Sequence, residues 1–241
     1  MKIKLTISYD GSGYYGSQIQ PNYKTVQSAL EDSFKVLNIS TKCEFSGRTD
    51  RYVHAFAQVV SCDIPEYWSN ISKLKQTLNK LLPNDILVRK IVKVSDDFHA
   101  RFSAKSREYR YIFTDKPLTP FTSKYISYYK DIDIKLINQA IECFVGVWDF
   151  EYFSKKGSEP ISTVREIYSI KFYRYKDIYV LRFKANSYLR SQIRMMVDFI
   201  MKISAKKLTI DDLEKQLKKQ QLISWSLASP HGLYLSKILY L

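Results

Sequence analysis

The sequence predicts an α+β fold, in which strands and helices alternate along a chain of 241 residues. Two observations lead to this prediction. Period-two alternation of apolar and polar residues, typical of half-buried strands, recurs from one end of the chain to the other. Between these runs lie stretches with apolar residues at helical spacing. The chain is 45% hydrophobic and 26% charged, as an ordinary globular protein is, and is long enough for one large domain or two small ones.

The first half of the chain predicts the order strand, helix, strand, helix, strand. Thr25 has the side chain of a helix cap, and Pro83 marks the end of a later helix. The elements expected here are strand 4–9, a helix beginning after Thr25, strand 57–64, helix 71–82 and strand 85–94. A turn is expected at 10–13, and a short strand is a candidate before residue 45.

The second half repeats the mixture of strands and helices. Residues 96–104 break the periodicity, so we place a domain boundary there and predict two domains, 1–103 and 104–241. The predicted elements are a strand around 109–113, helix 134–144 after Asp133, a hairpin of 165–173 with 178–186, a helix over 187–200, a helix after Thr209 and a strand near 233–235. Arg190 and Arg194 are four residues apart and are expected to share one helix face.

The charge balance is strongly basic. Lys and Arg number 38 against 24 Asp and Glu, a net charge of +14. Such a surplus favours a polyanionic partner, and nucleic acid is the first candidate. Many of the 19 tyrosines stand beside Arg or Lys, as suits phosphate contact with base stacking. A solvated lysine-rich surface explains part of the charge, and tyrosine-rich strands also pack cores.

Cysteine and histidine usage predicts neither a disulfide framework nor a metal site. The three cysteines form no C-x-x-C, and the three histidines are far apart in the sequence. This usage fits a reducing cytoplasm, which is the expected location. The first residues lead straight into a strand pattern without a signal peptide, and no apolar run approaches a membrane span.

The most informative stretch is Phe45-Ser46-Gly47-Arg48-Thr49-Asp50-Arg51-Tyr52-Val53-His54-Ala55. Residues 47–52 are expected to form a loop between rigid elements, where functional sites are common. Asp50 stands between Arg48 and Arg51, and nearby positive charge favours an ionised carboxylate that can act as nucleophile or base. A surface turn with a local ion pair is the alternative.

This stretch resembles the GRTDAGVHA signature of the TruA-type tRNA pseudouridine synthases, whose aspartate is catalytic. The matching residues are Gly47, Arg48, Thr49, Asp50, Val53, His54 and Ala55. The pair Arg51-Tyr52 replaces the usual Ala-Gly.

Further segments resemble the same family in the same order. Residues 9–18 resemble its YDG-x-x-(F/Y)-x-G-W-Q motif, with Ser17 in place of Trp. Residues 97–104 resemble DFHARFSA, and Gly146–Phe150 resembles G-x-x-D-F. The helix around Arg194 resembles R-x-x-V, although Asp198 stands where the family usually has Gly. Residues 229–235 resemble P-x-x-G-L-(Y/C)-L. Lys155-Lys156-Gly157-Ser158 is a basic loop, either an RNA contact or a solvated tip.

The resemblance implies the pseudouridine synthase fold: two similar α/β-sandwich halves with mainly antiparallel sheets and a basic RNA-binding cleft between them. It implies Asp50 as the catalytic carboxylate, Arg194 as its ion-pair partner and Tyr109 as the active-site tyrosine. We expect Tyr111 to take the opposite face of the strand from Tyr109. The predicted RNA-binding residues are Arg48, Arg51, His54, Arg101, Arg107 and Arg190.

The same resemblance implies tRNA as substrate, with uridines of the anticodon stem-loop (positions 38–40) as targets, a homodimer, and no metal or organic cofactor. Two other functions remain open from the residues alone. A non-catalytic RNA-binding module would suit the charge and the tyrosines. A small-molecule hydrolase acting on a nucleoside would use Asp50 but would have no need of the basic surplus.

Overall fold

The computed structural model of the chain describes residues 1–155, 157 and 161–240. These residues form two compact units. The first unit holds residues 1–105 together with the segment from Tyr234, and the second unit holds Ser106–Leu233. The predicted basic loop at Lys155 lies partly outside the described residues. Within the described residues, no helix has both the length and the apolar character that crossing a bilayer requires.

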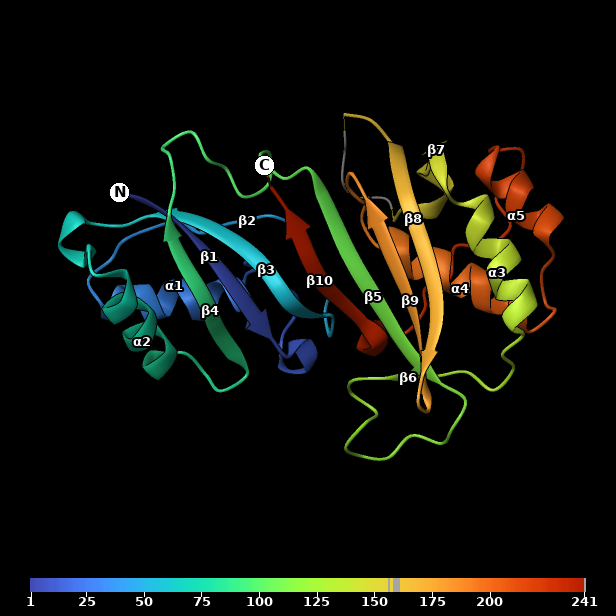
Figure 1. The fold of residues 1–241 in the computed structure, drawn as a ribbon, viewed down its shortest axis with the longest axis horizontal. Helices are drawn as coiled ribbons and strands as arrows, with labels where there is room; N and C mark the ends of the chain where they lie inside the picture. Colours follow the sequence, from blue (N-terminus) through green and yellow to red (C-terminus); the bar gives the residue numbers. More distant parts are fainter. Residues whose placement is uncertain (156, 158–160, 241) are drawn as a thin grey trace. The chain divides into compact units, whose positions relative to one another are not determined.

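The first unit is built on a sheet in the order β4-β1-β3-β10 (Figure 1). Strand β1 is antiparallel to both β3 and β4, the short β2 pairs with β3, and β10 joins β3 in parallel. The strands are β1 (Lys2–Tyr9), β2 (Glu44–Phe45), β3 (His54–Asp63), β4 (Ile86–Lys93) and β10 (Leu233–Leu239). Four consecutive residues of β3, Val59 to Cys62, are buried, so both faces of this strand are covered.

Two helices complete the first unit, α1 (Val26–Val36) and α2 (Ile71–Leu81), with the 3-10 turns η1 (Gly11–Gly13) and η2 (Glu66–Trp68). The predicted cap of α1 is confirmed, because the Thr25 side chain accepts a hydrogen bond from the Ser28 backbone and Ser28 reciprocates. Each helix buries an apolar stripe, Leu30 and Phe34 in α1 and Leu74 and Leu78 in α2.

The second unit contains a sheet in the order β5-β9-β8-β7, with antiparallel pairs throughout, and β6 pairs with β5 in parallel. Its strands are β5 (Ser106–Thr114), β6 (Ser127–Tyr128), β7 (Gly146–Asp149), β8 (Val164–Tyr175) and β9 (Ile178–Ala185). The predicted hairpin is confirmed as β8 and β9, and Lys176 turns the chain between them with φ 53°.

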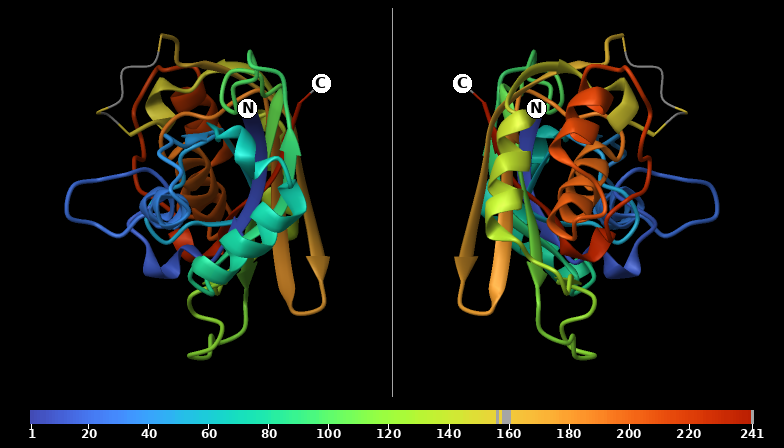
Figure 2. Two further views of the ribbon diagram at one scale, coloured as in Figure 1. Left: turned by 90° about the vertical axis from the view of Figure 1, so that its left-hand side faces the viewer. Right: turned by 90° about the vertical axis from the view of Figure 1, so that its right-hand side faces the viewer.

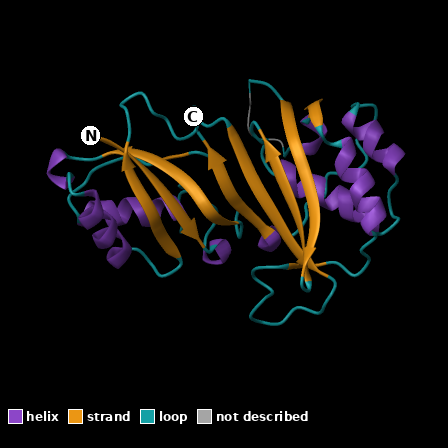
Figure 3. Ribbon diagram, viewed as in Figure 1, coloured by secondary structure: helices purple, strands orange, loops and turns teal. Residues whose placement is uncertain are grey.

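The helices of the second unit are α3 (Ile134–Cys143), α4 (Gln192–Ser204) and α5 (Ile210–Leu217), with the 3-10 turns η3 (Glu151–Phe153) and η4 (Pro230–Gly232). Figure 3 shows these three helices gathered beside the strands of their unit. Phe153 joins the helices to the core, since its ring lies 5.2 Å from that of Phe144 and 5.8 Å from that of Phe199. Mixed helices and mostly antiparallel strands confirm the predicted α+β class.

Two features differ from the predictions. Helix α4 begins at Gln192 rather than near residue 187, because Ser191 takes the left-handed conformation with φ 60°. Arg190 therefore precedes the helix, and the predicted helix face shared by Arg190 and Arg194 was wrong. The predicted division into 1–103 and 104–241 also differs from the two units, since β10 returns to pair with β3 of the first unit.

Candidate active site

Asp50 lies in the loop between β2 and β3, and its side chain is half-buried while Arg48 and Arg51 are exposed. The backbone N–H of Val53 donates to the carbonyl of Asp50 at 3.1 Å, which closes a tight turn just before β3. Neither Arg48 nor Arg51 forms an ion pair among the described residues, so a turn stabilised by these local charges does not account for the loop.

Buried hydrogen bonds fix the loop immediately before Asp50. The Thr49 N–H donates to Ser17 Oγ at 2.9 Å, and the Ser17 N–H donates to the Thr49 carbonyl at 3.1 Å. The hydroxyls of Tyr9 and Thr49 are 2.8 Å apart. Ser17 is fully buried, so where the family has Trp this chain has a small side chain that hydrogen-bonds the Asp50 loop directly.

The structure also shows how the loop accommodates Arg51-Tyr52 in place of the family's Ala-Gly. Tyr52 has φ 69°, the left-handed region in which the family's Gly is unstrained and a tyrosine costs about 1–2 kcal/mol. Its N–H donates to the Tyr14 carbonyl at 3.4 Å. The loop thus keeps the conformation that glycine favours, despite a bulky residue there.

His54 is the first residue of β3 and is 1% exposed. Its Nδ1 accepts a hydrogen bond from the Gly11 N–H at 3.0 Å, and Asp10 Oδ1 lies 3.2 Å from the same nitrogen. The Tyr234 ring stacks on the imidazole at 4.7 Å. These contacts assign His54 to holding η1 against the strand that follows the Asp50 loop, and burial does not favour an RNA contact.

Stability at alkaline pH should depend on Tyr9. Burial raises the pKa of Tyr9 from 10.0 to about 12, against the opposing effect of hydrogen bonds with Thr49 and Gln58. The folded state therefore holds this proton more tightly than the unfolded state, and the resulting stabilisation, full below pH 10, is lost as the pH rises toward 12. Urea midpoints of wild type and Tyr9→Phe between pH 8 and 11.5 should show a shallower decline for the variant. Parallel declines would contradict this assignment.

Tyr109 lies on β5 and is 7% exposed. Tyr111 is buried too, and the two share a face because residues two apart in a strand point the same way; the expectation of opposite faces was wrong. The Tyr188 ring meets Tyr109 edge-on at 5.3 Å and 86°. The Tyr188 hydroxyl is buried without a hydrogen-bond partner among the described residues, and burial, followed by Tyr109 and Glu108, raises its pKa well above 10. Tyr188 could not be identified from the sequence, since no local pattern indicates which ring will pack on Tyr109.

Arg194 lies in the first turn of α4 and is half-buried. Its Nε donates to the Ala228 carbonyl at 2.8 Å, and the Ala228 N–H donates back to the Arg194 carbonyl at 3.0 Å. The segment leading into η4 is thereby attached to the helix turn that carries the arginine.

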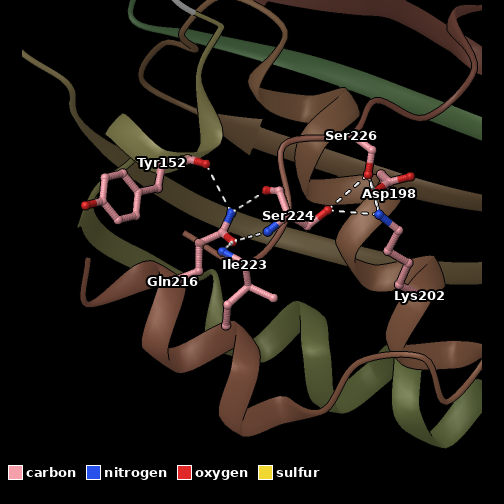
Figure 4. A network of polar contacts seen from close by, with 7 residues as sticks. All are labelled: Tyr152, Asp198, Lys202, Gln216, Ile223, Ser224 and Ser226. Atoms are coloured by element: carbon pink, nitrogen blue, oxygen red, sulfur yellow. Dashed lines mark hydrogen bonds and ion pairs between the residues drawn. The ribbon is translucent and has the colours of Figure 1, made fainter. Parts of the chain in front are cut away.

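A polar network also holds the segment that leads into η4, through Ser224 and Ser226 (Figure 4). Asp198 Oδ2 accepts from Ser226 at 2.5 Å and from Lys202 Nζ at 2.9 Å, and Lys202 also donates to Ser224 at 2.9 Å. The Gln216 amide bonds both the carbonyl and the N–H of Ser224, each at 2.8 Å. Asp198, where the family usually has Gly, therefore helps to position the segment that contacts Arg194.

The remaining predicted RNA-binding residues differ in accessibility. Arg101 and Arg190 are exposed. Arg107 is 8% exposed, and its guanidinium donates to the Asn186 carbonyl at 3.1 Å. In the first unit the structure brings Arg48, Asp50, Arg51 and His54 together in one loop and the strand that follows. Arg107 and Tyr109 share β5 in the second unit, and the predicted pairing of Asp50 with Arg194 stays a prediction.

Comparison with known proteins assigns the family. The sequence model described as tRNA pseudouridine synthase matches residues 5–103 and 140–240. A Campylobacter jejuni protein named tRNA pseudouridine synthase A is 41% identical over 240 residues, covering 100% of both chains. A Wolinella succinogenes protein of that name is 38% identical, covering 96% of this chain and 92% of its own. A Bacillus cereus protein named tRNA pseudouridine synthase A 1 is 35% identical, covering 99% and 98%. With matches of this extent, the chain belongs to the tRNA pseudouridine synthase family.

Proposed function

We propose that this chain isomerises uridine to pseudouridine in tRNA. Full-length identity of 41% to a protein named tRNA pseudouridine synthase A carries the proposal. The loop geometry supports it, because Asp50 sits in a turn whose neighbours are fixed by buried hydrogen bonds through Thr49 and Val53. Preorganisation of this kind is what a catalytic carboxylate requires.

The reaction breaks the N1–C1′ bond of uridine, turns the uracil, and forms a C5–C1′ bond. The C5 proton leaves and N1 takes up a proton, so the atoms balance without an oxidant, a reductant or a second substrate. A carboxylate, a group that holds the detached base and a proton acceptor suffice. We accordingly propose that neither a metal nor an organic cofactor takes part.

Asp50 supplies the carboxylate, which acts on C1′, on C6 or on a proton of the sugar. Arg194 pairs with it and balances its negative charge, as an arginine beside a carboxylate does. Tyr109 stacks on the target uracil. An ordinary tyrosine, with a pKa near 10, is a poor base at neutral pH, so stacking is its main role.

The target uridine must leave its stack to reach the carboxylate, which costs a few kcal/mol. Arg48, exposed beside Asp50, fills the vacated space, and the other basic residues bind phosphates. We further propose uridines 38–40 of the anticodon stem-loop as targets, a homodimer as the functional assembly and the cytoplasm as its location. Of the predicted phosphate contacts, exposure favours Arg51, Arg101 and Arg190 over the buried His54 and Arg107.

Release of tritium from C5-labelled uridine in unmodified tRNA tests this function. Wild type should release label in a multiple-turnover reaction, and binding should weaken steeply between 50 and 200 mM salt because phosphate contacts release counterions. Binding of tRNA with no release from any uridine would favour a non-catalytic RNA-binding module. Activity on a free nucleoside that is insensitive to salt would favour a hydrolase.

A further inference from the structure

Four side chains beside Asp50 form a continuous stack, which we call the Tyr23–Tyr52 ladder: Tyr23, Tyr15, Arg51 and Tyr52. The rings of Tyr23 and Tyr15 are stacked at 4.3 Å and 27°. The Arg51 guanidinium lies 4.0 Å from the centre of the Tyr15 ring and 4.3 Å from that of Tyr52. Arg51 therefore contacts two rings, those of Tyr15 and Tyr52, and Tyr23 joins the ladder through Tyr15.

The ladder is held in place by the backbone that carries it. The Tyr15 N–H donates to the Lys24 carbonyl at 2.9 Å, and the Gln20 amide donates to the Tyr15 carbonyl at 2.5 Å. These bonds close the segment between η1 and α1, which extends away from the strands in both views of Figure 2. Tyr23 and Tyr15 are therefore ordered before any ligand arrives, which lowers the entropy cost of binding.

The ladder contributes little to the core, because Tyr15 is 36% and Tyr23 50% exposed. It also includes Tyr52 in a strained left-handed conformation. Arg51 has no carboxylate partner among the described residues, so its charge remains for a phosphate. Exposed rings interleaved with a cation are the chemistry that binds an unpaired nucleobase and its phosphate.

We propose that the Tyr23–Tyr52 ladder binds the nucleobase next to the target uridine, with that base stacked on the face of Tyr23 turned away from Tyr15. The proposal rests on the proposed function, because it places the target uridine at Asp50, the residue before Arg51. The usual Ala-Gly of the family would supply neither the guanidinium nor the ring of Tyr52. The guanidinium and the Tyr52 ring thus come from the two positions at which this sequence departs from that pattern.

A double-mutant cycle tests the contact between the Tyr23 ring and the base next to the target uridine, because it removes the ring, the base or both. The RNAs are an unmodified tRNA and two versions with an abasic nucleotide on the 5′ or the 3′ side of the modified uridine. On intact tRNA, Tyr23→Ala should raise Kd and KM by about 5- to 100-fold and leave kcat within about 2-fold, as loss of one stacked base predicts. On one of the abasic RNAs, wild type and Tyr23→Ala should agree within about 2-fold.

Control variants separate stacking from folding. Tyr23→Phe keeps the ring and should bind like wild type, and Arg51→Ala/Tyr52→Gly, which restores the family pattern, should lose affinity as Tyr23→Ala does. Tyr67→Ala, at a tyrosine 67% exposed elsewhere in the first unit, should change nothing. Two results would overturn the ladder. One is equal binding of intact tRNA by Tyr23→Ala and wild type. The other is a loss of affinity in Tyr23→Ala, relative to wild type, that is as large on both abasic RNAs as on intact tRNA. A wild type that binds tRNA without releasing tritium would overturn the proposed function, while the Kd values of wild type and Tyr23→Ala on intact tRNA still test whether the ladder binds RNA.

Discussion

Replacing Asp50 by Asn is expected to lower tritium release at least about 10³-fold while tRNA affinity changes by less than about 3-fold. Asn keeps the size of the side chain but can act neither as a nucleophile nor as a base. The buried contacts that position the loop are made by its neighbours, above all the paired hydrogen bonds between Thr49 and Ser17. The variant should therefore fold, bind tRNA and fail at the chemical step.

Single-turnover assays with enzyme in excess over tRNA measure this step directly, because they remove product release from the rate. Asp63→Asn is the matched control, since Asp63 is a 73% exposed carboxylate whose contact with Lys2 spans 4.0 Å. It should retain full activity. If Asp50→Asn kept more than a tenth of the wild-type rate, the carboxylate would not carry the chemistry.

The sequence was most informative about the type of each element. Helix α1 and the hairpin of β8 and β9 appear where periodicity, a cap and a turn predicted them, because these signals are local. The start of α4 could not be predicted, since the apolar spacing runs on through Leu189 while the backbone at Ser191 turns left-handed. The place of β10 beside β3 depends on pairing between residues about 180 positions apart, which no local pattern encodes.

The candidate site shows the same limit. Asp50 was found because its motif is contiguous in the sequence. The bonds between Ser17 and Thr49 join segments 32 residues apart. The sequence alone shows only that Ser17 replaces the Trp of the family motif and that Arg51 replaces its Ala. The structure gives both a physical role, because burial and stacking depend on which segments meet in space.

Gly11→Ala is expected to damage both stability and catalysis, while Gly13→Ala, two residues away in the same turn, should do neither. A Cβ at Gly11 would lie 2.0 Å from the Val53 carbonyl oxygen and 2.6 Å from its carbon, and backbone atoms cannot move aside cheaply. A Cβ at Gly13 would meet only the Asp85 carboxylate, at an ordinary 3.6 Å. We expect Gly11→Ala to cost about 1–3 kcal/mol, or roughly 2–10 °C in Tm, and Gly13→Ala to stay within about 0.5 kcal/mol.

We expect Gly11→Ala to lower catalysis because Val53 is hydrogen-bonded to the backbone of Asp50. Its N–H closes the turn on the Asp50 carbonyl, so displacing Val53 displaces the loop that carries the carboxylate. A misplacement of about 1 Å can cost about 10²-fold in rate, and we expect a loss of that order in kcat/KM for Gly11→Ala at a temperature where it is still folded. Tm and tritium release, measured on both variants, check this. We expect both losses because the same displacement of Val53 disturbs the fold and the Asp50 loop. A Gly11→Ala enzyme that is less stable but fully active would show that η1 supports the fold without positioning Asp50.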